Sequence, residues 1–355
     1  MISPKDVSLK FNTPFEHLIR TKETIIHPIL LSIGLVVGLF ILLKSADYFI
    51  DKSLDIFSSL RMPPFIIGAV VIGFGTSLPE LSVGVSSALS GDSLLALSSV
   101  IGSNIANIAL VLGVSIALSS KIKDLSDFKE EAGFLVAISL ILYFFVSDTT
   151  LSRAEGVILL GLFIVFLCHQ LFFNHNSEKY QNHSYQQSHE GEKGQSHKPV
   201  TWKDGVLLLA FLGFLLLSAE VIVICATELA AAFNISDSLI GLTVIALGSS
   251  MPELASSLAA VKKGRIKLVL GNVVGSNAMN TLLVLGIATT ISPLSHIEQG
   301  LKNIHVPTVL GLSVLVLVGI MFDDWKKPAS TKIVGGCMVI AYGVYLILLK
   351  VYPVI

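Results

Sequence analysis

Two glutamates, Glu80 and Glu253, lie deep inside long apolar stretches of the sequence. Each is the only charged residue in its stretch, 64–90 for the first and 239–261 for the second. A carboxylate at the middle of a membrane helix costs about 2.5–3.5 kcal/mol on insertion scales. The cost of two such carboxylates has to be offset, and a bound cation would offset it. Both glutamates are therefore candidate ligands for a cation. The alternative is a protonated glutamate that joins two helices by hydrogen bonds.

A proline precedes each glutamate, as Pro79 and Pro252. Proline lacks a backbone N–H and clashes with the carbonyl group four residues earlier, so it breaks or kinks a helix. We therefore expect the chain to unwind near Gly73 and Ala246 and to turn backbone carbonyl oxygens toward a cavity. A simple packing kink is the alternative.

Small polar residues occur at helical spacing before each glutamate and in the apolar stretch that follows it. Residues three or four apart share one face of a helix, which places hydroxyl groups beside each carboxylate. Taken singly, such residues also serve as contacts between packed helices. The candidates are Thr76, Ser77, Ser103 and Asn107 in the first half, and Ser249, Ser250, Ser276 and Asn280 in the second.

Together these residues offer only oxygen ligands: carboxylates, hydroxyls, amides and backbone carbonyls, without His or Cys. About six to eight oxygen ligands suit Ca2+, whereas softer metals call for thiolate or imidazole. Two negative charges match one Ca2+, and the same cage can hold several Na+ in its place. Mutual exclusion between these two loads is what an antiporter requires.

The two glutamate segments belong to an internal repeat with an offset of 173 residues. GTSLPEL (75–81) maps onto GSSMPEL (248–254), and GSNIANIALVLG (102–113) maps onto GSNAMNTLLVLG (275–286), without a gap. Corresponding apolar stretches are five apart, and an odd separation reverses direction across a membrane. Inverted repeats of this kind are typical of secondary transporters, whose site lies where interrupted helices of both halves meet.

The composition places the apolar stretches in a membrane. Hydrophobic residues make up 53% of the 355 residues and charged residues only 14%, against about 25% charged in a soluble domain. A transmembrane helix needs about 20 mostly apolar residues. The sequence therefore predicts an all-α polytopic membrane protein with about ten transmembrane helices in two inverted five-helix repeats. The ten stretches are 28–50, 64–90, 94–120, 132–147, 156–173, 205–233, 239–261, 268–293, 306–322 and 333–349.

A hydrophilic segment separates the two halves. The division that we expect is a polar N-terminal tail at 1–27, a first five-helix repeat at 28–173, a linker at 174–204 and a second five-helix repeat at 205–355. The linker fits a solvated loop, and its histidines also fit a metal or pH sensor. These are His175, His183, His189 and His197. Lys and Arg gather in loops on the linker's side, which predicts a cytoplasmic linker and both termini outside.

The motifs GTSLPE and GSSMPE, each followed by GSN-x-x-N, resemble the two α-repeats of the cation/calcium exchanger superfamily, in its Na+/Ca2+ exchanger branch of prokaryotic type. The resemblance covers residues 30 to 350. It implies a ten-helix inverted-repeat fold with central cation sites, in which Glu80 and Glu253 bind Ca2+ jointly, helped by Thr76 and Ser249. It implies Na+ positions lined by Ser77, Ser103, Ser250 and Ser276 and by the backbone oxygens of Gly73 and Ala246.

The resemblance further implies a transporter and not an enzyme, with no bound cofactor, in the plasma (inner) membrane of a prokaryote. In the family the first and sixth helices slide over the core to give alternating access. Exchange of more than two Na+ for each Ca2+ moves net charge, so electrogenic transport is expected. Asn280 stands where many relatives, including K+-dependent ones, have Asp, so we expect exchange without K+.

Three other functions use similar residues. A Ca2+/H+ antiporter would use the same two glutamates as proton carriers, but relatives of that type show a G-N-x-x-E pattern that GTSLPE and GSSMPE lack. A cation channel normally relies on rings of equivalent subunits. A membrane hydrolase needs a Ser-His or metal-His constellation, and the apolar stretches contain none. The net charge of −1 gives no basic excess for nucleic acid, and nothing indicates a protein partner.

Overall fold

A computed structural model of the chain describes residues 14–60, 62–91, 93–119, 129–173, 200–232, 246–321 and 328–351. These residues form helices and short connections, and the only bridge between extended segments among them is an isolated antiparallel pair, Leu151 with Leu294. The all-α expectation is therefore confirmed for the described part of the chain. The linker histidines and residues 1–13 lie outside the described residues.

The first half of the chain begins with the long helix α1 (Pro14–Ser59), which extends into the segment expected as a polar tail. A broken helix follows, in which Pro64 occupies the first helical position, where its missing N–H costs nothing. The helices of this half after α1 are α2 (Pro64–Ile66), η1 (Ile67–Ile72), α3 (Gly73–Thr76), α4 (Leu78–Leu89), α5 (Ser93–Ile105), η2 (Ala106–Leu112), α6 (Gly113–Leu118), α7 (Lys129–Val146), α8 (Arg153–Cys168) and η4 (His169–Phe173).

The second half repeats this order with bounds shifted by the offset of the sequence repeat. Adding 173 to the bounds of α4 gives 251–262, those of α13, and adding it to the bounds of α5 gives 266–278, those of α14. The repeat is therefore present in the secondary structure as well as in the sequence. The helices of this half are α10 (Trp202–Ala232), α12 (Ala246–Ser249), α13 (Met251–Lys262), α14 (Ile266–Ala278), η6 (Met279–Val284), α15 (Leu285–Ile291), η7 (Leu301–His305), α16 (Val306–Met321) and α17 (Pro328–Val351).

Nine predicted apolar stretches coincide with a described helix or a run of joined helices, and the tenth, 239–261, does so from residue 246, because 239–245 lie outside the described residues. By length and composition, 6 described helices can cross a membrane, and 7 if the bent pair 64–76 and 78–89 is one span. The chain is therefore a multi-pass helical membrane protein. The number of ten spans stays a prediction.

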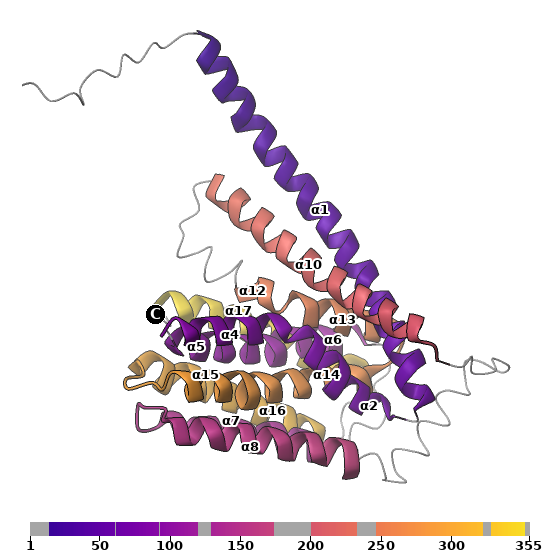
Figure 1. Cartoon of the computed structure of the whole chain (residues 1–355), viewed down its shortest axis with the longest axis vertical. Helices are drawn as coiled ribbons and strands as arrows, with labels where there is room; N and C mark the ends of the chain where they lie inside the picture. Colours follow the sequence, from indigo (N-terminus) through magenta and orange to yellow (C-terminus); the bar gives the residue numbers. More distant parts are fainter. Residues whose placement is uncertain are drawn as a thin grey trace, which may run out of the picture.

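Burial separates a central pair of helices from a peripheral pair. The apolar part of Ser93–Leu118 is 78% buried and that of Ile266–Ile291 is 94% buried, against 22% for each of α1 and α10. Figure 1 shows α1 and α10 side by side, crossing the stack formed by the other helices. Their outward side chains, such as Val36 at 70% and Leu209 at 67% exposure, are apolar, as a lipid-facing surface requires.

Two ion pairs hold the polar end of α1 to its neighbours. Lys52 Nζ lies 3.0 Å from Asp204 at the start of α10, and Lys263 Nζ, after α13, lies 2.8 Å from Asp51. All four side chains are partly exposed, and pairs of this kind contribute about 0–1 kcal/mol each. They join α1 to its neighbours at this end and add little to the stability of the fold.

Glycines allow the broken helix of the first half to pack directly against the backbone of α14. A Cβ atom at Gly271 would collide with the carbonyl oxygen of Phe65, and a Cβ atom at Gly275 would collide with the carbonyl oxygen of Ala69. Close packing of backbones through small residues is a common means of association for membrane helices. This contact joins a helix of the first repeat to a helix of the second, directly beside the glutamate segments.

We predict that Gly275→Ala lowers the apparent Tm of the purified protein in detergent by a few degrees. The added methyl group meets backbone atoms that cannot turn away, and overpacking costs about 1–3 kcal/mol. Gly102→Ala, at the matched position of the first repeat, is the control, because a Cβ there meets nothing within 4 Å. An equal loss of Tm in both variants would contradict the packing argument.

Candidate cation site

Each glutamate lies in the first turn of a helix that starts after a one-residue break. Helix α3 ends at Thr76, Ser77 has φ −87° and ψ 10°, and Glu80 follows in the first turn of α4. The second repeat has the same geometry, with Ser250 at φ −90° and ψ 7° before Glu253. The helix axis turns by 48° at the first break. An interruption is present in each repeat as expected, but it lies at Ser77 and Ser250 and not near Gly73, which has the helical values φ −58° and ψ −42°. Each carboxyl group lies at the positive end of a helix dipole.

The break is short and most of its backbone groups remain paired. The Gly73 carbonyl oxygen accepts a hydrogen bond from the Ser77 N–H at 3.1 Å and from Ser276 Oγ at 3.4 Å. This oxygen was expected to face a cavity as a cation ligand. In the structure it instead accepts a hydrogen bond from a hydroxyl of the other repeat. Ala246 is the first residue of α12, and its side chain is not described.

The two carboxyl groups are buried, and each holds one hydroxyl. Glu80 is 2% exposed and Glu253 is 0% exposed. Ser103 Oγ donates to Glu80 Oε1 at 3.2 Å, and Ser77 Oγ of the first repeat donates to Glu253 Oε1 of the second at 3.2 Å. The other oxygen of each carboxyl group, Oε2, is buried with no hydrogen-bond partner among the described residues.

Further contacts cross between the repeats. The hydroxyls of Ser103 and Ser249 lie 3.4 Å apart, and Thr76 Oγ1 lies 3.4 Å from Oδ1 of Asn272 on α14. Through these hydroxyls and the Ser276–Gly73 contact, most of the predicted ligands form one buried cluster around the two carboxyl groups.

Three predicted residues contribute buried polar atoms without a partner. Ser250 Oγ, both amide atoms of Asn107, and Asn280 Oδ1 have no hydrogen bond within the described part of the chain. Native proteins leave few buried polar atoms unsatisfied, and an unpaired one often marks the place of an ion or water. Together with the two free carboxylate oxygens, these atoms are candidate cation ligands. No hydrogen bond ties Asn107 or Ser250 to the rest of the cluster.

Three polar residues that contact this cluster were not identified from the sequence: Asn104, Asn272 and Thr281. Asn280 Nδ2 donates to Asn104 Oδ1 at 3.2 Å, and Asn104 Nδ2 donates to Thr281 Oγ1 at 2.8 Å. Asn104 could have been found, because the GSN motif repeats as Asn277. Asn272 could not, because its counterpart at the offset of 173 is Ser99.

The ligand types in the cluster suit a hard cation. It combines two carboxyl groups with hydroxyl and amide oxygens, and no group of three His, Cys, Asp or Glu side chains gathers anywhere in the described ranges. The two carboxyl groups belong to one buried cluster, and like charges repel strongly where the dielectric constant is low. A divalent cation between them removes that repulsion, and oxygen ligands of this type suit Ca2+.

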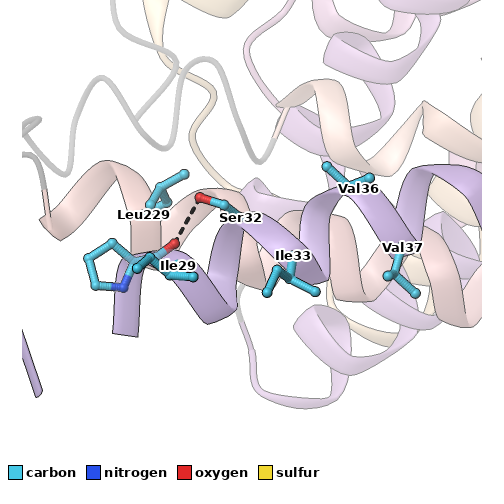
Figure 2. A pocket seen from close by; sticks show the side chains of 7 residues that line it. Ile29, Ser32, Ile33, Val36, Val37 and Leu229 are labelled. Atoms are coloured by element: carbon cyan, nitrogen blue, oxygen red, sulfur yellow. Dashed lines mark hydrogen bonds between the residues drawn. The ribbon is translucent and has the colours of Figure 1, made fainter. Parts of the chain in front are cut away.

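An apolar pocket of about 410 Å³ lies elsewhere, between α1 and α10. Figure 2 shows its lining of aliphatic side chains and one serine, Ser32, whose hydroxyl donates to the Pro28 carbonyl at 2.8 Å. The pocket presents no carboxylate and no unpaired polar side chain to its interior. It is part of the lipid-facing surface and not of the cation site.

Comparison with known proteins gives consistent results. The family model described as sodium/calcium exchanger protein matches residues 30–172 and 204–351. A putative antiporter, CaxA of Alkalimonas amylolytica, is 37% identical over 265 residues, which cover 74% of this chain and 81% of that protein. The sodium/calcium exchanger MaX1 of Methanosarcina acetivorans is 28% identical, with 80% of this chain and 89% of that protein covered.

A solved structure is also similar. It is that of the sodium-calcium exchanger NCX_Mj soaked with 2.5 mM Na+ and 10 mM Sr2+, with a TM-score of 0.73 and 29% sequence identity. The match covers 89% of this chain and 98% of that one.

We predict that Ca2+ raises the Tm of the purified protein and that Glu253→Gln removes most of this shift. Binding to the folded state stabilises it by about 2.7 kcal/mol when the ligand is at 100 times its Kd. In chelator alone the variant should be the more stable protein, because a neutral amide costs less to bury than a carboxylate.

The control for this measurement is Glu155→Gln. Glu155 is part of the capping box of α8, away from the cluster, and glutamine preserves such a box. A Ca2+ shift that survives in Glu253→Gln would remove this glutamate from the site.

Proposed function

The chain belongs to the sodium/calcium exchanger protein family, and we propose that it exchanges Na+ for Ca2+ across the membrane by alternating access, without K+ and with movement of net charge. It is a membrane transporter and not an enzyme. The observation that carries the proposal is the pair of buried glutamates with one unpaired oxygen each, surrounded by hydroxyls and amides of both repeats.

The charge of the cluster supports exchange over simple release. An empty site with two ionised glutamates carries uncompensated charge inside the bilayer, which is costly. A loaded site is close to neutral with one Ca2+, and several Na+ also compensate it. The protein therefore interconverts readily between its inward-facing and outward-facing states only when the site holds cations. This requirement couples the transport of the two ions.

The fold that we propose has ten spans in two inverted repeats. The matched bounds at the offset of 173 support two copies, and five spans in each copy give opposite directions. The helices proposed to slide are α1 and α10. Their low burial of 22% supports this, because little packing has to be broken when they move.

We propose Na+ and not H+ as the counter-ion because the site contains neutral oxygen ligands in addition to the two glutamates. Hydroxyl and amide oxygens, such as those of Ser250 and Asn107, can coordinate Na+ but do not take up or release a proton at neutral pH, so they cannot transport H+. A Ca2+/H+ antiporter needs only the two glutamates, and the buried polar atoms beyond them would then lack a role. We also propose the plasma membrane as its location, with the linker in the cytoplasm.

We predict that an inward-directed Ca2+ flux into proteoliposomes requires an opposing Na+ gradient. In 45Ca2+ uptake with Na+, H+ or K+ gradients imposed separately, only Na+ should drive uptake, and Glu80→Gln should abolish it. An imposed membrane potential should change the Na+-driven rate, because each charge that crosses 100 mV is worth about 2.3 kcal/mol. Uptake driven by H+ alone would favour the Ca2+/H+ antiporter.

The neutral amides at Asn107 and Asn280 generate the prediction on K+. Without a third carboxylate, the site lacks the charge that an additional K+ would require, so flux should be unchanged when choline replaces K+ on both sides. Asn280→Asp should strengthen cation or proton binding and slow turnover, since tighter binding raises the barrier to release. Loss of wild-type flux in choline would place the protein in the K+-dependent branch.

A further inference from the structure

Asn272 lies at the meeting point of the two repeats and uses both ends of its side chain. It is on α14, is 1% exposed, and is not among the residues expected to bind a cation. Its Nδ2 donates to Ser257 Oγ at 3.0 Å, to Ser256 Oγ at 3.2 Å and to the Glu253 carbonyl oxygen at 3.4 Å. Its Oδ1 accepts from Thr76 Oγ1 at 3.4 Å.

The orientation of this amide follows from its partners. A backbone carbonyl oxygen can only accept, so the atom that faces the Glu253 carbonyl has to be Nδ2, and Oδ1 has to face Thr76. The Thr76 hydroxyl has one proton and three acceptors in reach: the Ile72 carbonyl oxygen at 3.0 Å, Asn272 Oδ1 at 3.4 Å and the Gly73 carbonyl oxygen at 3.5 Å. With the proton held on that side, the oxygen lone pairs remain for a cation.

The network exists in one repeat only. At the offset of 173, Asn272 corresponds to Ser99, and Ser256 and Ser257 correspond to Val83 and Gly84. Valine and glycine have no side chain that can receive an amide N–H. Three positions that differ between otherwise similar repeats are therefore the ones that form this network, which makes the two halves of the site unequal.

We propose that Asn272 is the positioning residue of the Ca2+ site: it fixes the Thr76 hydroxyl of the first repeat relative to the Glu253 helix of the second. The inference rests on the proposed function for the identity of the cargo. Asn272 does not touch the cation itself and acts through Thr76. Ca2+ takes about six to eight oxygen ligands, so its binding depends on each hydroxyl of the site being held in place.

The test is equilibrium 45Ca2+ binding to the purified full chain, which reads the site whatever the counter-ion is. Asn272→Ser, which copies the first repeat and is too short to bridge, should raise the Kd for Ca2+ about tenfold or more, as loss of a partner behind a metal ligand typically does. Ser99→Ala is the matched control and should leave the Kd unchanged.

A double-mutant cycle with Thr76→Val separates positioning from general destabilisation. If Asn272 acts through Thr76, then Asn272→Ser adds little in the Thr76→Val background, because contacting residues are not additive. Additive losses, or an unchanged Kd in Asn272→Ser, would overturn the inference. If Asn272→Ser does not fold, Ser257→Ala decides: it removes the shortest bond of Asn272, and an unchanged Kd again overturns the inference.

The same measurement keeps the two proposals apart. Wild-type protein that binds no Ca2+ overturns the proposed function and this inference with it. Ca2+ binding without Na+-driven transport overturns the proposal that Na+ is the counter-ion. The double-mutant cycle still supports or rejects the positioning role of Asn272 in that case.

Discussion

Two carboxyl groups are buried in a helical interior where no ion pair within the described residues neutralises them. Glu80 and Glu253 are nearly inaccessible, each accepts a hydrogen bond from one serine hydroxyl, and each keeps one oxygen that no described residue contacts by a hydrogen bond. An isolated ionised carboxylate is very unfavourable in a medium of low dielectric constant. Hydroxyl donors and helix N-termini offset part of this cost, and a bound cation offsets the rest. The stability of the protein and its exchange of cations therefore depend on the same charges.

This constraint explains the shape of the helices around the site. A new helix starts after each break with proline as its second residue, Pro79 in α4 and Pro252 in α13, and its first turn carries the glutamate. The helical segment that leads to the first break packs against α14, where Gly271 and Gly275 let the backbone of Phe65 and Ala69 approach closely. The two most buried spans, Ser93–Leu118 and Ile266–Ile291, contribute serine and asparagine side chains to the cluster. The helices α1 and α10, which face lipid, are the least buried of the six candidate spans, and partly exposed ion pairs join α1 to its neighbours.

The two repeats share a backbone plan but not a set of contacts. Ser103 donates to Glu80 within the first repeat, whereas its counterpart Ser276 donates to the Gly73 backbone across the repeats. Asn280 accepts no bond at Oδ1 but donates to Asn104, whereas neither amide atom of its counterpart Asn107 has a hydrogen-bond partner among the described residues. A symmetric cage would treat its two carboxylates alike. The observed asymmetry gives the Glu253 side a fixed network and leaves the Glu80 side with fewer contacts, which suits a site that has to accept two different loads.

The sequence by itself determined the membrane class, the helical spans, the repeat and the two glutamates, because each depends on local properties. Apolar length defines a span, proline defines a break, and an isolated charge in an apolar stretch stands out. It also identified Ser77 and Ser103, since helical spacing places them near a carboxylate. Only the tertiary structure decided which carboxylate each serine meets, that the Gly73 carbonyl is already paired, and that Asn272 joins Thr76 to the Glu253 helix. Those contacts join residues about 175 to 205 positions apart or lie on different helices, and they follow from how two helices pack, which no local pattern specifies.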